Sequence, residues 1–245
     1  DDAINAGDIA KIIQTDPVIT TKLIKAANSA LYGGQSAVET CSGAVIRLGN
    51  KLTHKLVLTY TMQDIFKPKS SRLQKRMREL WQHSTKVAAI CYVLAKRDKR
   101  FEPEHAMLAG LMHDIGVVAI LNYANEFPEK IENSKVLEQA IQQLRAQTGS
   151  MILRKWEFPT EFIVTALECE EWMRDTGNKP DYCDLVIVAQ LHSFIGAGLT
   201  QNVPPMHKVP ALDRLDLGDL TPRRSLKILD KAEDQIARAE LLLNI

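Results

Sequence analysis

The chain has 245 residues, 45% of them hydrophobic, which suffices for a sizeable core in one large domain or two small ones that share an interface. Its 31 Lys and Arg nearly balance its 30 Asp and Glu, so no global field attracts nucleic acid or an anionic membrane. An apolar run such as residues 185–189 is far short of the roughly 20 residues that cross a bilayer, and we expect no signal sequence at the start of the chain. We therefore expect a globular, cytoplasmic protein that is neither inserted in a membrane nor exported.

Cysteine usage agrees with a reducing compartment. The four cysteines lie far apart and form no Cys-x-x-Cys pair; they are Cys41, Cys91, Cys169 and Cys183. This pattern predicts buried, reduced thiols and no metal–thiolate site. The sequence begins at Asp1-Asp2 without a Met, and we expect it to be a fragment that a further domain precedes.

The first 66 residues show helical apolar spacing. Ile9, Ile12 and Ile13 share one helix face, and a second helix is predicted to begin at Asp16-Pro17, an N-cap followed by Pro in the first turn. After a break at Gly33-Gly34, the pattern predicts a short helix that ends at Leu48-Gly49 and a longer one over 52–65. Residues 1–66 are thus predicted to form an N-terminal helical subdomain.

The segment 67–71 interrupts the apolar period with Pro, Ser and charge, and predicts a subdomain boundary. A second bundle is expected over 72–199. Its predicted helices are a long one over 73–95, one from Glu102-Pro103 to His113-Asp114, and others at 117–124, 135–147, 149–156, 160–171 and 182–197. No β-alternation of useful length appears, so the fold class is all-α.

The last part of the chain, 200–245, is predicted to complete the same module. Residues 200–222 are rich in proline and predict an ordered but irregular strap. Thr221-Pro222 then predicts the start of a last helix, whose apolar stripe is typical of a core or self-association surface.

One constellation could carry chemistry. His113-Asp114 ends an apolar helix, and His83 lies on the preceding long helix. Two imidazoles and a carboxylate can bind a divalent ion, which lowers the pKa of a bound water and supplies hydroxide near neutral pH. The sequence therefore offers three ligands for a metal hydrolase.

These residues also carry a family resemblance. The segment from His83 through Leu108-Ala109-Gly110-Leu111-Met112-His113-Asp114-Ile115-Gly116 resembles the HD phosphohydrolase superfamily. The flanking motifs are similar to its HDOD branch; they are Asp16-Pro17-Val18, Ala27-Asn28-Ser29-Ala30-Leu31-Tyr32, Ala44-Val45-Ile46-Arg47-Leu48-Gly49, and Gly149 through Trp156 followed by Phe158-Pro159. The resemblance spans essentially the whole chain. It implies a multi-helix bundle of HD-domain type with an N-terminal subdomain, and a bacterial signalling output or regulatory module that has lost its hydrolase machinery.

The resemblance implies which positions form the metal site of active HD enzymes, and this chain carries different residues at several of them. Where those enzymes carry a further Asp after an apolar run, this chain has Ala189-Gln190, and Asp184 lies about 240° around that helix and about 9 Å along its axis. Where relatives with a two-metal site carry additional histidines, this chain has Arg145 and Glu170-Glu171. Where active relatives often carry a Lys, it has Val117. Arg145 would repel a cation. We therefore regard His83, His113, Asp114 and Gln190 as vestigial positions, and expect no catalytic residue and no bound metal.

Other polar residues give weaker signals. Glu170 and Glu171 diverge by about 100° on a helix and are expected to face solvent. A local basic cluster, predicted to be a solvated face or protein-docking surface, comprises Lys67, Lys69, Arg72, Lys75, Arg76 and Arg78, with Lys96, Arg97, Lys99 and Arg100 further along. His54, His105, His192 and His207 are isolated and predict no ligand set.

Three functions remain open from the sequence. The first is a non-enzymatic signal-transduction module that binds a protein partner or a linked sensory or receiver domain, with no expected cofactor, membrane or nucleic acid. The second is a residual phosphohydrolase that uses a divalent Fe, Mn or Zn ion at His83, His113 and Asp114 to act on a nucleotide or cyclic dinucleotide. The third is a small-ligand sensor that uses the degenerate cavity. In the first case we expect Asp114 to accept hydrogen bonds from His83 or nearby backbone amides.

Overall fold

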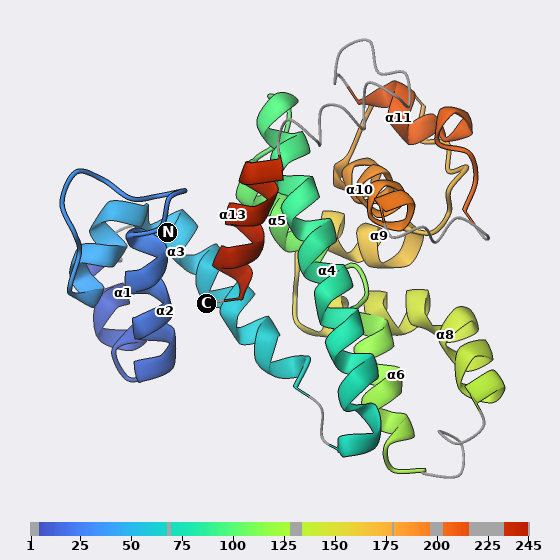
Figure 1. Cartoon of the computed structure of the whole chain (residues 1–245), viewed down its shortest axis with the longest axis horizontal. Coiled ribbons are helices and arrows are strands. Elements are labelled where there is room, and N and C mark those ends of the chain that lie inside the picture. The colour runs from blue at the N-terminus through green and yellow to red at the C-terminus, as the bar shows by residue number, and fades with distance from the viewer. Residues whose placement is uncertain are drawn as a thin grey trace. The chain divides into compact units, whose positions relative to one another are not determined.

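The computed structural model describes residues 5–67, 70–127, 134–177, 179–196, 203–215 and 233–244. Over these ranges the chain consists of helices joined by turns and has no β-strand, which confirms the predicted all-α class (Figure 1). The chain divides into two compact units, Asp1–Asp64 with Ala237–Ile245, and Ile65–Ile236. Residues 237–245 thus group with the first unit. The division made from the sequence, 1–66, 72–199 and 200–245, stays a prediction.

The first unit begins with helices α1 (Ala6–Ile13) and α2 (Pro17–Ala27). As expected, Asp16 caps α2: its Oδ1 accepts hydrogen bonds from the amides of Val18 and Ile19, at 2.8 and 3.1 Å. Such a cap satisfies amides that the first helical turn leaves without partners. The start of α2 is therefore set locally by two adjacent residues.

The third helix, α3 (Cys41–Ile65), is broken at the predicted point. Gly49 has φ 76° and ψ 161°, which is not helical. Glycine adopts this positive φ without the steric penalty that a Cβ imposes. The kink separates the two helical stretches that the sequence predicts on either side of Leu48-Gly49.

Two residues of the family-like motifs hold the loop between α2 and α3. The side chain of Asn28 donates to the Val38 carbonyl at 2.7 Å and accepts from the Val38 amide at 2.8 Å. Arg47 donates to the carbonyls of Ser36 and Ala27, at 2.6 and 3.1 Å. These motif residues therefore have a structural role in the first unit.

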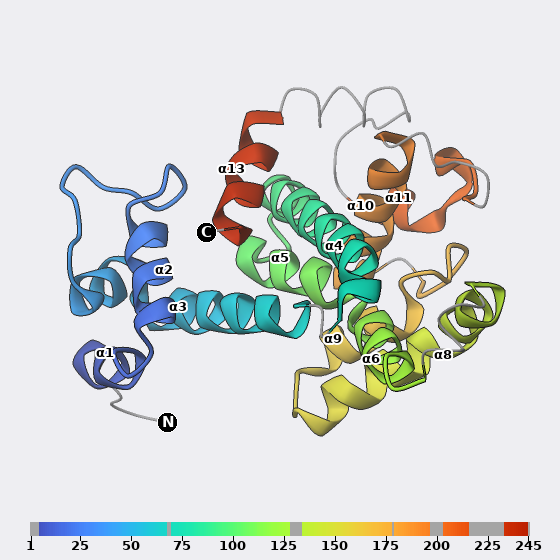
Figure 2. The same cartoon turned by 60° about the horizontal axis from the view of Figure 1, so that its bottom comes forward.

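The second unit is a bundle around the long helix α4 (Ser71–Arg97), which packs along α5 (Pro103–Met112) and α10 (Tyr182–Gly196) (Figures 1 and 2). Helix α6 (Ile115–Ala124) packs on α8 (Ser134–Lys155), and α8 on α9 (Thr160–Glu168). His113 and Asp114 form the turn between α5 and α6. The predicted helices at 117–124 and 160–171 are thus present with slightly different ends.

Helix α8 corrects the sequence analysis at Gly149. We expected separate helices at 135–147 and 149–156, but α8 is continuous from Ser134 to Lys155. A Cβ on Gly149 would lie 3.3 Å from the Cβ of Ala166 in α9 and 3.4 Å from the Gly116 amide nitrogen in α6. Glycine at this position therefore permits close helix packing and does not end the helix.

The stretch Pro103–Ala124 is long and apolar enough to cross a membrane by length and composition alone, with a hydropathy of 1.4. In the structure it is α5 and α6 with a turn between them, and 78% of the apolar window is buried inside the protein. Such burial is what a core segment of a folded bundle shows. The stretch therefore serves as the centre of the second unit.

The described part of the strap is more regular than predicted. Residues 203–215 contain a 3₁₀ turn, Met206–Lys208, and the short helix α11 (Pro210–Arg214). Arg214 binds Asp184 at the start of α10, at 2.6 and 3.0 Å. The last helix, α13, is described as Glu233–Leu243. The rest of the strap prediction and the predicted helix start at Thr221-Pro222 lie outside the described residues.

Candidate functional site

The fold brings together the three residues that the sequence offers as metal ligands. His83 lies in the middle of α4, His113 ends α5, and Asp114 precedes α6. Each offers one ligand atom, and these atoms lie within 4.8 Å of one another. The His83 and His113 rings meet edge to face, with centroids 5.3 Å apart. His113 and Asp114 are buried, whereas His83 is partly exposed.

The orientation of the His113 ring follows from its contact with the backbone. Its Nδ1 lies 2.7 Å from the Gly110 carbonyl oxygen. Because a carbonyl only accepts, we assign the proton of the neutral ring to Nδ1, which leaves a lone pair on Nε2. Nε2 lies 3.4 Å from Oδ2 of Asp114. The ring thus presents a potential ligand atom toward the carboxylate.

Arg145 on α8 is the partner of Asp114 that the sequence analysis did not identify. Its Nη2 lies 3.2 Å from Asp114 Oδ1, and its Nη1 lies 2.7 Å from Oε1 of Glu170. The expectation that His83 or nearby backbone amides donate hydrogen bonds to Asp114 is wrong for the described residues, because its side chain does not cap the start of α6 and its Oδ1 accepts no hydrogen bond. The negative charge of Asp114 is balanced by a guanidinium.

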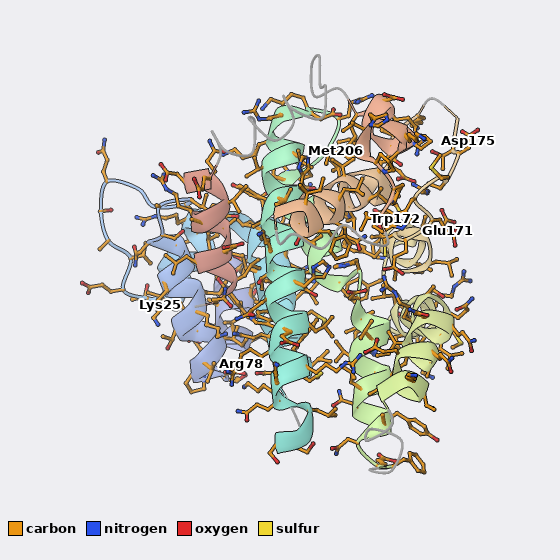
Figure 3. The ribbon with its side chains drawn as sticks, turned by 45° about the vertical axis from the view of Figure 1, so that its right-hand side comes forward. Lys25, Arg78, Glu171, Trp172, Asp175 and Met206 are labelled. Carbon is orange, nitrogen blue, oxygen red and sulfur yellow. The ribbon has the colours of Figure 1, made fainter. Side chains whose placement is uncertain are left out.

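Glu170 has a partner that the sequence analysis did not identify. It is exposed, as expected, but it also forms an ion pair with Arg145 beside the cluster. Glu171 is exposed, as expected, and lies beside Trp172 after α9 (Figure 3). The turn that follows α9 explains the divergence of the two carboxylates, since α9 ends at Glu168 and residues 169 and 170 are not helical.

Burial controls the protonation of the two histidines. It lowers the pKa of His83 to about 4, with a further lowering from His113, and it also lowers the pKa of His113. Burial raises the pKa of Asp114, but its interactions with His113 and Arg145 oppose this and the net shift is downward. At neutral pH the cluster is therefore two neutral imidazoles and a carboxylate beside a guanidinium.

Gln190, which the sequence analysis regards as the fourth vestigial position, is buried on α10. Its Nε2 donates to the carbonyl of Cys169 at 2.8 Å, and the Cys169 thiol lies 4.0 Å from the His113 carbonyl oxygen. The Oε1 atom of Gln190 makes no hydrogen bond to the described residues. The amide thus links α10 to the end of α9 next to His113, and it brings no negative charge to the cluster.

The ligand atoms of the cluster favour a bound metal ion, whereas the neighbouring positive charge disfavours one. Two imidazoles and a carboxylate could hold zinc or a similar ion, with an open position for water. However, Arg145 places a positive charge 3.2 Å from the carboxylate, and that charge repels a divalent cation at the same place. With Arg145 present the cluster does not fit a divalent metal centre, and we derive no reaction step through a metal.

Two further residues near the cluster were missed by the sequence analysis. Phe194 stacks on His83, with ring centroids 5.2 Å apart and 14° between the planes. Trp172 meets the Phe194 ring at 6.3 Å. Both lie far from His83 in sequence, so no local pattern could have identified them.

Asp184, by contrast, points away from the Gln190 position as predicted. It is fully buried and binds Arg174 and Arg214. Val117 is buried in α6. The four cysteines are buried and free, as expected.

Three residues of the described basic cluster are paired with acidic residues. Arg76 pairs with Glu138, Lys75 lies 3.9 Å from Glu79, and Arg100 binds Asp98 at 2.6 and 2.8 Å. Arg78 is exposed on α4 (Figure 3). Lys69 and the Arg72 side chain lie outside the described residues. The basic cluster is therefore partly neutralised.

The isolated histidines have separate surroundings. The His105 ring lies between Phe162 and Tyr182, at 4.4 and 4.5 Å, and His192 is buried, which lowers its pKa to about 4. His54 and His207 are exposed. None of them belongs to the ligand group found in the described part of the chain.

Comparison with known proteins identifies a related family and related structures. The model of the HDOD domain matches residues 1–171. Among solved structures, one from Shewanella amazonensis SB2B, presented as a candidate metal-dependent phosphohydrolase, is 24% identical, with a TM-score of 0.78 over 98% of this chain and 85% of that one. An HDOD domain protein of unknown function from Geobacter sulfurreducens is 21% identical, with a TM-score of 0.72 over 99% and 88%.

A third structure, presented as a candidate signal transduction protein from Marinobacter aquaeolei VT8, is 20% identical, with a TM-score of 0.66. This chain is covered completely there but spans 56% of that protein. No curated protein matches the chain significantly. At these identities the solved structures show a common fold, whereas the family model covers most of the chain, and the chain therefore belongs to the HDOD family.

Proposed function

We propose that the chain is a bacterial, cytoplasmic signal-transduction module that works without catalysis, through binding of a protein partner or a linked sensory or receiver domain. The observation that carries the proposal is the ion pair between Arg145 and Asp114, at 3.2 Å. It neutralises the only carboxylate of the ligand group. A hydrolase of this design would need that carboxylate for its metal ion.

Other observations support the same function. Gln190 supplies a neutral amide where active relatives carry a carboxylate, and it is already bound to the Cys169 carbonyl. A protein with the same fold from Marinobacter aquaeolei is presented as a candidate signal transduction protein. These facts favour a scaffold whose polar centre joins helices.

The second candidate function is a residual metal-dependent phosphohydrolase. It is favoured by the close grouping of His83, His113 and Asp114 and by the name given to the Shewanella protein of the same fold. The third, a small-ligand sensor, has less support. Two cavities of about 380 and 510 Å³ are lined mainly by residues of α6 and α8, not by the three-residue cluster.

Elemental analysis and an activity assay separate these functions. We expect the chain, purified without chelator, to contain far less than one metal ion per molecule and to hydrolyse neither nucleotides nor cyclic dinucleotides. Stoichiometric iron, manganese or zinc, together with turnover that His113→Ala abolishes, would overturn the proposal. Partners captured from the native host should bind the purified chain directly, and His113→Ala should leave that binding unchanged.

A further inference from the structure

The His113–Asp114 contact places two hydrogen-bond acceptors against each other. Nε2 of His113 carries a lone pair, because Nδ1 is used toward the Gly110 carbonyl at 2.7 Å. Its neighbour at 3.4 Å is a carboxylate oxygen. Neither His113 Nε2 nor Asp114 Oδ1 makes a hydrogen bond to the described residues. Buried acceptors without donors cost free energy, so this arrangement requires a positive group beside it.

Arg145 supplies that positive group, and the fold fixes its position. Its backbone lies at the crossing of α6 and α8, where a Cβ on Gly116 would be 2.0 Å from the Arg145 carbonyl oxygen. At the other end of the side chain, Glu170 binds Nη1 at 2.7 Å. The guanidinium is thus held from both sides, with Nη2 buried at 3.2 Å from Asp114.

We propose that the Arg145 guanidinium takes the place of a metal ion in this cluster, and that removing its charge turns His83, His113 and Asp114 into a zinc site. This inference rests on the proposed function, in which the unaltered chain binds no metal. It identifies Arg145 as the residue that keeps the metal out. The remaining ligand set, two imidazoles and a carboxylate, would then have a net negative charge.

The spacing of the ligands suits this exchange. Zinc bonds to nitrogen and oxygen of about 2.0–2.2 Å place the ligands of a tetrahedral site about 3.4 Å apart. His113 Nε2 and Asp114 Oδ2 are already 3.4 Å apart, and all three ligand atoms lie within 4.8 Å of one another. The Nδ1 contact with Gly110 also holds the ring in the tautomer that a metal-binding histidine needs.

The test is zinc binding by the whole chain carrying Arg145→Ala. After incubation with zinc and exhaustive dialysis, elemental analysis should find about one zinc per Arg145→Ala molecule and almost none in the wild type. The zinc affinity should rise by about 100-fold or more, since a like charge has been removed at short range. Cobalt, added as a probe, should give the visible absorption of a tetrahedral site in the variant alone.

Three further variants show whether charge is the cause. Arg145→Lys retains a positive charge and should take up no zinc. Glu170→Gln removes the other partner of Arg145 but keeps the guanidinium, so it should also stay free of zinc. Asp114→Asn added to Arg145→Ala should abolish the zinc gain. Zinc retained in this double variant would show that the metal binds elsewhere and would overturn the inference.

The outcomes separate this inference from the proposed function. A wild-type chain with stoichiometric metal and turnover contradicts the proposed function. If the wild type is free of metal and Arg145→Ala is folded by circular dichroism but binds no more zinc, only this inference fails. Should Arg145→Ala not fold, Arg145→Gln provides the same test, because its neutral amide can still reach toward Glu170.

Discussion

Two buried carboxylates in the second unit have opposite surroundings. Asp184 is fully buried and accepts hydrogen bonds from Arg214 at 2.6 and 3.0 Å, from Arg174 at 3.2 Å and from the Asp181 amide at 3.2 Å. Asp114 has one guanidinium at 3.2 Å and a histidine lone pair on its other oxygen. Only Asp184 has donors in good geometry on both oxygens.

The difference distinguishes a carboxylate surrounded by donors from one surrounded by other acceptors. A carboxylate placed for stability is surrounded by donors, because an unpaired buried charge is costly. A carboxylate placed for metal binding faces other ligand atoms, which are acceptors. Asp114 has the second kind of surroundings, and the positive charge of Arg145 compensates for them.

Loss of Asp184 should have the largest effect on stability. Asp184→Ala leaves two guanidinium groups in the protein interior, since the Arg174 and Arg214 side chains are each only 6% exposed. Breaking a buried ion pair in this way should cost about 3–5 kcal/mol in the free energy of unfolding. Urea denaturation measures it. Asp213→Ala, at an exposed position beside Arg214, is the control and should change stability by no more than about 0.5 kcal/mol.

Asp114 should be less costly to remove. Asp114→Ala should destabilise by about 1–3 kcal/mol, less than Asp184→Ala, because Arg145 keeps its contact with Glu170 at 2.7 Å. Asp114→Asn retains an acceptor and should cost clearly less than the Ala change. Melting temperatures of wild type and both variants, each with and without EDTA, measure the effect. A large drop in the wild-type melting temperature with EDTA alone, absent from both variants, would instead indicate a bound metal.

The smallest expected effect is a loss of stability in mild acid. Burial lowers the pKa of His83 and of His192 to about 4 each, whereas an unfolded histidine titrates near ~6.5. The unfolded chain therefore binds protons first, and stability falls as the pH drops from about 6.5 toward 4. Between pH 7 and 6 each histidine should cost less than about 1 kcal/mol.

The pH at which stability is lost also distinguishes the surroundings of Asp114 from those of Asp184. Burial raises the pKa of Asp181, but its hydrogen bond with Arg174 contributes to a net lowering, so the network around Asp184 should lose stability only at more acidic pH. Denaturation at pH 7 and 6 should show a shallower pH dependence in His83→Gln and His192→Gln than in wild type. His207→Gln, at an exposed position, should keep the wild-type dependence; an equally shallow slope there would contradict the assignment.

Several features of the fold could be predicted because they depend on neighbouring residues. Asp16-Pro17 begins α2, Gly49 breaks α3, and His113-Asp114 lies where one apolar helix ends and the next begins. Caps, glycine conformations and apolar periods act within one or two helical turns. The sequence therefore identified most of the helices and the three possible ligands.

Only the tertiary structure decided how the polar residues pair. Arg145 was expected to repel a cation, but its contact with Asp114 depends on the crossing of α6 and α8 at Gly116 and Gly149. The same crossing explains why Gly149, which a local pattern marks as a break, lies inside a continuous helix. Residues distant in sequence meet only after packing, and neither helical period nor composition contains that information. The sequence by itself determined which groups could bind a metal, whereas the packing of α8 on α6 determined that a guanidinium lies among them.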